Sequence, residues 1–421
     1  MFNAVKDAFK IEDLRRRIFY TIAMLALVRL GSVMPNPLLR ADLVDSIFSQ
    51  ESSAMQLFNI MSGNAFQNMN LFALGIVPYI NASIIMSLLA IAIPALEEIQ
   101  KDGESGRKKI AQYTRWLTVV LALIQAFAIT FSLRSGLISQ VGRVWAMIVS
   151  ILAFTAGSAF IMWIGENITE NGIGNGISLI IFANILSRVP AMITALFSYN
   201  LPWWKLLLLV LAFVIIVAFT VMLSLAERRV PIQYAKRMQG RKQYGGNSTN
   251  LPIRVNMAGV IPIIFAVSLI SFPSIITSFF TSNPTGWWGK ALNWISTSHP
   301  FGAALYALLI IAFTFFYAQI QFNPVEVADN MKKSGGFVPG IRPGRPTADY
   351  LKRITKYITF IGAIGLAILA TIPVLMQRFF GIANLSIGGS SLLIVVGVAL
   401  ETMKQIESQL VLRHHKGFLN R

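Results

Sequence analysis

Ten long apolar segments dominate this chain of 421 residues. Hydrophobic residues make up 55% of the sequence and charged residues only 13%, about half the charged share of an ordinary soluble protein. A helix needs about 20 apolar residues to cross about 30 Å of hydrocarbon. The sequence therefore predicts an all-α polytopic membrane protein with ten transmembrane helices. The predicted spans are residues 18–34, 71–93, 114–133, 144–164, 173–196, 204–224, 256–280, 301–322, 354–376 and 385–403.

Positive charge lies mostly on one side of these spans. Of the 36 Lys and Arg residues, 28 fall in the terminal segments and in the loops 94–115, 225–255 and 323–356, and the opposite loops carry 7. Cytoplasmic loops are those enriched in Lys and Arg, so both termini are expected in the cytoplasm. The loop 165–172 is an exception, because it has two glutamates and no base. No small-residue cleavage site follows the first span, which we expect to be retained.

One charged side chain, Arg29, falls inside the first span. A charge at the bilayer centre costs at least about 2.5 kcal/mol. Arg29 is near the outer end of its span, so we expect its long side chain to extend to the membrane surface.

Two segments 184 residues apart begin almost identically. Ala73–Ile80 reads ALGIVPYI and Ala258–Phe265 reads AGVIPIIF. A second echo joins Gly176–Ile181, which reads GISLII, to Gly389–Ile394, which reads GSSLLI. Paired helices interrupted by Gly or Pro in the two halves of a membrane protein indicate a duplicated fold with its pathway between the halves.

Residues 54–66 are apolar but too short to cross a membrane. A run of this length is typical of a re-entrant or interfacial segment. Backbone at membrane depth is tolerated only where protein or a water-filled cavity surrounds it, so this segment is expected in a cavity on the outer side. The alternative is an amphipathic helix on the membrane surface.

The sequence offers little catalytic chemistry. It has no cysteine, no Asp inside any predicted span, and no Ser/His/Asp set, HExxH or Walker motif. Glu166 and Glu401 lie at the cytoplasmic ends of spans, and we interpret the pair His414–His415 as part of a solvated tail. We therefore expect no enzyme activity, cofactor or metal. An ion-coupled transporter usually has ionisable groups facing its pathway, which argues against that class.

Two long loops on the cytoplasmic side, within residues 225–255 and 323–353, are basic. Tyrosines are interspersed with the bases of the first, and Gly and Pro enforce turns in the second. Basic loops with aromatic residues suit phosphate backbones, with salt-sensitive binding. An acidic protein surface is an equally good partner, and topology alone also predicts basic loops.

Isoleucines recur near the Gly and Pro breaks. Residues four apart in a helix share a face, and a ring of branched apolar side chains can close a pore by excluding water. Isoleucine is also common in ordinary membrane cores, which is the simpler interpretation. The candidates are Ile76 and Ile80, Ile177 and Ile181, and the repeat-equivalent Ile264 and Ile394.

Five long motifs stand out in and beside the loops. They are Glu104–Arg115, Trp163–Ser178, Tyr234–Arg241, Asn256–Pro262 and Ala328–Gly344. These motifs resemble those of the SecY family of bacterial protein-conducting channels and occur in the family's order, and the resemblance covers nearly the whole chain. The sequence departs from the family pattern at Asn64, where a second Gly is common, and at Asn81, where Ser is common.

The resemblance implies two pseudo-symmetric halves of five helices each, related as inverted repeats around a central hourglass pore. The N-terminal half is residues 1–200 and the C-terminal half is residues 201–421. The six isoleucines match the pore ring, and residues 54–66 match the plug, a short helix beneath the ring. The implied plug residues are Met55, Leu57, Phe58, Ile60, Met61 and Gly63.

The family also implies a lateral gate and a docking surface. The gate is the seam between spans 2–3 and 7–8, with Asn81, Ser87, Asn256 and Phe272, of which Asn81 and Phe272 approach each other. The docking residues are Arg237, Arg241, Lys242, Arg342 and Arg345.

The implied partners are the SecE and SecG subunits, the SecA motor ATPase, the ribosome, the translocating polypeptide with its signal peptide, and membrane lipid. The implied function is passage of unfolded polypeptides across the bacterial cytoplasmic membrane and lateral release of transmembrane segments. The alternatives are a secondary transporter built on inverted repeats, and a scaffold protein in which the isoleucines are mere packing.

Overall fold

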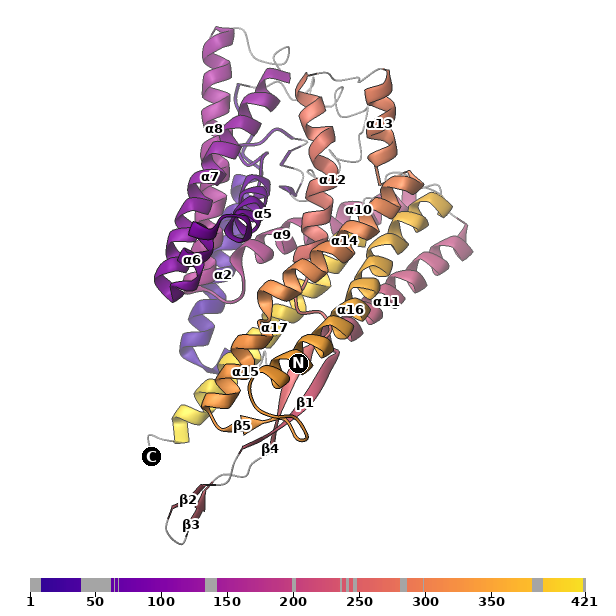
Figure 1. The fold of residues 1–421 in the computed structure, drawn as a ribbon. Coiled ribbons are helices and arrows are strands. Elements are labelled where there is room, and N and C mark those ends of the chain that lie inside the picture. Colours follow the sequence, from indigo (N-terminus) through magenta and orange to yellow (C-terminus); the bar gives the residue numbers. More distant parts are fainter. Residues whose placement is uncertain are drawn as a thin grey trace.

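A computed structural model describes residues 9–38, 62–63, 65–66, 68–132, 142–198, 202–234, 237–239, 242–244, 248–280, 286–297, 299–380 and 389–418. Helices dominate it. In Figure 1, α6, α7 and α8 gather on one side, and α11, α14 and α16 on the other. Strands occur together at one end, where α17 also ends.

The described chain before residue 200 is mostly helical, and short breaks separate α5 from α6 and α9 from α10. Ile93 has extended backbone before Pro94, because proline disfavours a helical conformation in the residue before it. The break bends α5 and α6 by 105° relative to each other. The helices are α2 (Glu12–Gly31), α5 (Val77–Ala92), α6 (Pro94–Lys101), α7 (Gly103–Ser132), α8 (Arg143–Asn171), α9 (Gly176–Leu186) and α10 (Val189–Ser198).

The second part is helical too. Tryptophans begin α11 and α13, and Trp203 and Trp287 are both largely exposed, as is typical of side chains at a membrane–water interface. The helices are α11 (Trp203–Leu225), α12 (Ile261–Phe280), α13 (Trp287–Ile295), α14 (Pro300–Gln321), α15 (Pro324–Lys333), α16 (Arg345–Phe380) and α17 (Gly389–Phe418).

Every predicted span contains described helix. By length and apolar composition alone, five helical segments of the described chain can cross a membrane, or six if α5 and α6 form one bent span. Three spans differ from the prediction. The segments 71–93 and 256–280 become helical only at Val77 and Ile261. Turn residues Ser187 and Arg188 divide 173–196 into α9 and α10. Proline at position 190 explains this break, because it has no N–H to donate to the preceding turn.

The sequence repeat is a structural repeat. Gly75 and Gly259 both have left-handed backbone, with φ of 54° and 63°, and each precedes its helix by two residues. Glycine adopts this conformation without the strain that a Cβ would add. The second echo behaves likewise, because Gly176 and Gly389 are the first residues of α9 and α17.

The two basic loops fold together into a small sheet, which the sequence did not lead us to expect. Strands β1 (Glu227–Tyr234), β4 (Ser248–Arg254) and β5 (Gly336–Phe337) pair antiparallel in the order β4-β1-β5. Strands β2 (Arg237–Gln239) and β3 (Lys242–Tyr244) form a separate hairpin. Val230 and Ile232 alternate with exposed residues along β1 and pack with Leu351 of α16. In the sequence, the exposed bases at the start of β1 made the segment look like a basic loop, and its alternation of buried and exposed residues was not recognised.

The two ends of the described chain meet near this sheet. Leu14 of α2 is buried against Ile173 and Ile406, the latter on α17. Lys404 of α17 donates a hydrogen bond to the carbonyl of Ser224 at 3.1 Å, and burial lowers the pKa of its ammonium group. The first and last helices are therefore held at the same end of the molecule.

Candidate pore, gate and docking surface

A single buried cluster joins the two parts of the chain. We call it the central cluster and define it by its members from the two repeats. On the first side these are Ile76, Ile80 and Ile181, and on the second Val260, Ile264, Ile394 and Val398, all at most 8% exposed. Ile177 is half-buried and packs against the cluster. All six candidate ring isoleucines thus lie in or against one apolar core.

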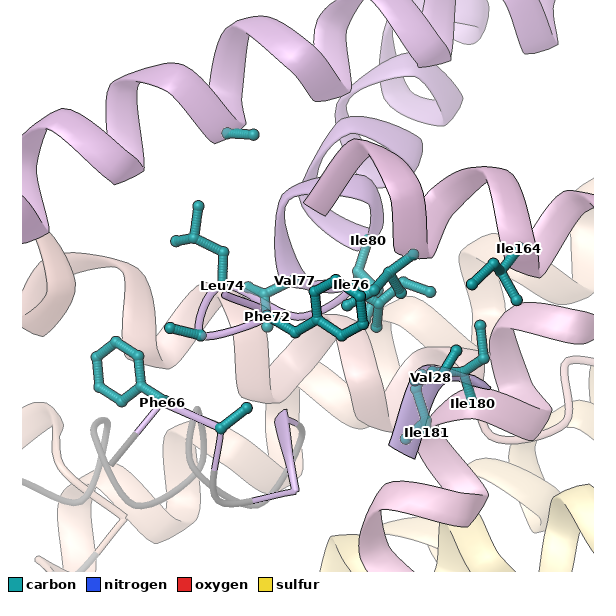
Figure 2. Close-up of a cluster of buried hydrophobic side chains, with 14 of the residues drawn as sticks. Val28, Phe66, Phe72, Leu74, Ile76, Val77, Ile80, Ile164, Ile180 and Ile181 are labelled. Carbon is teal, nitrogen blue, oxygen red and sulfur yellow. The ribbon is translucent and has the colours of Figure 1, made fainter. Parts of the chain in front are cut away.

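The first side of the cluster is positioned by the starts of α5 and α9. Figure 2 shows Ile76 and Ile80 at the beginning of α5, in the same group of buried side chains as Ile180 and Ile181. The amide oxygen of Asn175 caps α9 by accepting hydrogen bonds from the two N–H groups at positions 177 and 178, at 3.1 and 3.2 Å.

Close helix contact holds α9 in place. A Cβ added to Gly176 would lie 2.0 Å from the carbonyl oxygen of Gly165 on α8. Only glycine at position 176 permits this approach. The contact fixes the position of α9 along α8. It therefore also fixes the positions of Ile177 and Ile181, which α9 carries.

The second side of the cluster comes from α12 and α17. A Cβ on Gly397 would lie 2.5 Å from Cγ1 of Val260, so α17 crosses closely over the residue before α12. Val260 precedes Ile264 by four residues, and Val398 follows Ile394 by four. The sequence analysis missed both valines, although this spacing was the signal that could have found them.

The end of the predicted plug packs against this core. Met55, Leu57, Phe58, Ile60 and Met61 lie outside the described residues. Ser62 and Gly63 are described, and Ser62 is 2% exposed. The Ser62 hydroxyl accepts a hydrogen bond from the N–H of Phe66 at 3.1 Å.

The described residues 65–66 and 68–76 are mostly turns. The N–H of Leu71 donates to the carbonyl of Met34 at 3.1 Å, and the hydroxyl of Ser158 donates to the carbonyl of Gly75 at 3.2 Å. These bonds fasten the segment to the end of α2 and to α8.

The predicted gate residues lie on or beside α5 and α12. Asn81 and Ser87 are partly exposed on α5, Asn256 is buried before α12, and Phe272 is 48% exposed on α12. Helix α12 contacts both α7 and α14. The approach of Asn81 to Phe272 stays a prediction.

A residue missed by the sequence analysis joins Ser87 across this seam. The side chains of Ser87 on α5 and Tyr317 on α14 are close enough to interact. The Ser87 hydroxyl donates a hydrogen bond to the carbonyl of Ser83 at 2.7 Å. Tyr317 also packs edge-on against Phe265, with ring centroids 5.0 Å apart. The gate seam therefore contains a polar contact set beside aromatic packing.

The predicted docking residues are only partly described. Arg237 and Lys242 lie in β2 and β3 without described side chains, and Arg241 lies outside the described residues. Arg342 and Arg345 are both exposed. The hydroxyl of Thr347 donates to the carbonyl of Arg342 at 2.8 Å, which fixes the turn that presents the two arginines.

An ion pair accounts for the loop with glutamates and no base. Nε of Arg115 on α7 donates to Oε1 of Glu166 on α8 at 2.8 Å. The base that balances Glu166 thus comes from another predicted cytoplasmic segment.

The structure has apolar helices of membrane-spanning length, and they surround a buried isoleucine cluster drawn from two repeats. This arrangement is typical of the class of polytopic α-helical membrane channels. The SecY family model matches residues 70–403. The chain is 44% identical to the protein translocase subunit SecY of Halalkalibacterium halodurans and 42% identical to that of Bacillus subtilis, over the full length of both chains in each comparison. The chain belongs to the SecY family.

Solved structures agree on the fold. A protein-conducting channel matches with a TM-score of 0.67 at 18% identity, covering 94% of this chain and 93% of that one. Sec61 in the canine ribosome–channel complex matches with a TM-score of 0.64 at 17% identity, covering 94% and 93%. The protein is a multi-pass membrane protein that forms a protein-translocation channel, and its family consists of channel-forming translocase subunits rather than enzymes.

Proposed function

We propose that an unfolded polypeptide crosses the cytoplasmic membrane between the halves 1–200 and 201–421, through the central cluster. The observation that supports this most strongly is the composition of the cluster, in which Ile80 and Ile264 come from equivalent places in the two repeats. Branched apolar side chains exclude water while the channel rests. They also adapt to the varied side chains of a passing polypeptide, which limits the leak of ions.

The plug is the second element of the proposal. Residues 54–66 rest on the outer side of the cluster and leave it when a polypeptide enters. The short chain between Gly63 and the start of α5 is fastened to α2 and α8. Displacement of the plug therefore needs no movement of the helices that hold the ring.

Hydrophobic segments leave sideways between α5 and α7 on one side and α12 and α14 on the other. Transfer of apolar area into lipid is favourable by about 25 cal/mol per Å², so a sufficiently apolar segment partitions outward once the seam opens. The contact of Ser87 with Tyr317 lies in this seam and favours the closed state.

A partner supplies the driving force from the cytoplasmic side, where both termini lie. Arg342 and Arg345 are exposed, and together with the bases Arg237, Arg241 and Lys242 they supply positive charge suited to the SecA motor or to ribosomal RNA. Similar channels have been solved as complexes with ribosomes. SecE and SecG are the expected subunits that accompany the channel.

Reconstitution into vesicles tests the proposal. Import of an unfolded precursor should require SecA with ATP, or a translating ribosome, and an ion gradient alone should not support it. Uptake of a small solute driven only by an ion gradient would favour a secondary transporter instead. Deletion of residues 54–66 should raise the ion conductance of the purified protein, whereas a scaffold without a pore would conduct no more after the deletion.

A further inference from the structure

Arg29 does not extend to the membrane surface as the sequence predicted. Its guanidinium turns inward, and Nη1 donates a hydrogen bond to Oδ1 of Asn184 on α9 at 3.2 Å. Asn184 is 2% exposed. A charged donor makes a stronger hydrogen bond than a neutral one, and little water competes for the asparagine. The pair is therefore a substantial link between α2 and α9.

This pair lies directly against the backbone of Gly63. A Cβ at Gly63 would be 2.4 Å from Nη1 of Arg29 and 3.2 Å from Oδ1 of Asn184. Gly63 also has left-handed backbone, with φ of 65°. Ser62 beside it is also enclosed, because a Cβ added at Gly75 would lie 3.4 Å from both the Cα and the Cβ of Ser62. The turn at 62–63 fits between the polar pair and the start of the repeat.

The same pair touches the helix that carries two of the ring candidates. Asn184 follows Ile181 by three residues and Ile177 by seven, so all three lie on one face of α9. The pair thus contacts the ring helix on one side and the turn at 62–63 on the other.

We propose that Arg29 and Asn184 are positioning residues that seat the Ser62–Gly63 turn against α9 and thereby keep the resting channel closed. The inference rests on the proposed role of residues 54–66 as the plug, of which this turn is the end. Opening moves Gly63 away and admits water to the guanidinium, so hydration replaces the contacts that are lost. We call the contact of Arg29 and Asn184 with the Ser62–Gly63 turn the latch. Because water replaces the lost contacts, opening of the latch is reversible.

The helices themselves do not depend on this pair alone. The hydroxyl of Thr21, two turns earlier on α2, accepts a hydrogen bond from the N–H of Ile173 at 3.1 Å. Asn184 can therefore be changed while α2 stays attached beside α9. The expected defect is in closure and not in folding.

The experiment uses the absence of cysteine from the chain. Ser62→Cys places a single thiol at the buried turn, and a membrane-impermeant maleimide added from the outer side reports its exposure. Asn184→Leu keeps the side-chain size but removes the acceptor. We expect it to raise both the labelling rate and the resting ion conductance about tenfold, which corresponds to about 1.4 kcal/mol.

Two further variants make the test specific. Asn184→Asp keeps an acceptor and adds a charge opposite Arg29, so labelling should be as slow as in the parent or slower. Asn167→Leu makes the same change on α8, where the side chain only donates to the carbonyl of Trp163, and should leave labelling unchanged. Arg29→Gln should reproduce the Asn184→Leu defect, since its shorter side chain does not reach Asn184.

Failure of this inference can be told apart from failure of the plug hypothesis. The thermal unfolding temperature of Asn184→Leu shows whether this variant is folded. If the folded variant labels and conducts like the parent while deletion of residues 54–66 still raises conductance, the positioning role of Arg29 and Asn184 is wrong and the plug hypothesis stands. If the deletion also leaves conductance unchanged, the proposed plug itself is wrong. Equal leak in Asn184→Leu and Asn167→Leu would show a general packing effect and also overturn the latch.

Discussion

Ile80 of α5 and Ile264 of α12 occupy equivalent positions in a repeat of 184 residues and are buried in the same apolar cluster. Each follows a left-handed glycine by five residues, and each N–H bonds to the carbonyl four residues earlier, at 3.1 and 3.2 Å. One local design, used twice, therefore brings two matching side chains into one apolar cluster. If this cluster is the constriction of the proposed pore, its width depends on how these side chains pack.

Replacing both residues by asparagine should open the resting channel to ions. Ile80→Asn with Ile264→Asn puts amides into the cluster, where they draw in water that the branched side chains exclude. We expect the resting conductance in planar bilayers to rise several-fold. Ile80→Leu with Ile264→Leu conserves volume and polarity and should stay close to the parent. Conductance unchanged by the asparagine pair would contradict the placement of the constriction.

The sequence predicted what depends on local pattern. Apolar length located the helices, and the repeat located the glycines that begin α5 and α12. It missed Val230 and Ile232 as strand residues, because two exposed bases precede them and a proline lies between them. It also gave no sign of contacts between distant residues, as when Arg29 reaches an asparagine 155 residues away or Tyr317 meets Ser87. The residues next to these four in the sequence show no pattern that indicates either contact.

A disulfide across the gate should stop translocation. Asn81→Cys and Phe272→Cys introduce the only two thiols into a chain without cysteine. If the gate residues approach each other as predicted, mild oxidation joins them, because a disulfide requires Cα atoms no more than about 7 Å apart.

The oxidised channel should then fail to import a precursor into vesicles, and a reducing agent should restore import. Each single cysteine variant, treated in the same way, is the control and should remain active. A complete cross-link that leaves import intact would rule out opening of this seam as a required step.

Loss of the polar contact between Ser87 and Tyr317 should make the gate easier to open. Tyr317→Phe and Ser87→Ala each remove one hydroxyl, and we expect either change to destabilise the closed state by up to about 1 kcal/mol. Precursors with a weakened, less apolar signal peptide should therefore be imported faster by either variant.

The double variant separates this contact from general effects of each substitution. If the two hydroxyls act through one another, Tyr317→Phe combined with Ser87→Ala should be no more permissive than the stronger single variant. Additive gains would mean that the residues act separately, and import of weak precursors at the parental rate would mean that the contact does not hold the gate closed.

Gly157 should tolerate no side chain, because α8 touches the turn that leads into α5. A Cβ there would lie 2.2 Å from the carbonyl oxygen of Leu71 and 3.1 Å from Cδ1 of Phe72. Since the first of these is backbone, Gly157→Ala must push the turn away from α8, and overpacking of this kind costs about 1–3 kcal/mol. The thermal unfolding temperature of the detergent-solubilised protein should fall. Ala156→Ser adds one heavy atom at the exposed neighbouring position and should change the unfolding temperature little.

The turn displaced by Gly157→Ala leads through Gly75 to Ile76 and Ile80, so this substitution should also raise the resting conductance at temperatures where the protein is folded. A lower unfolding temperature with unchanged conductance would show that the contact stabilises the fold without setting the constriction.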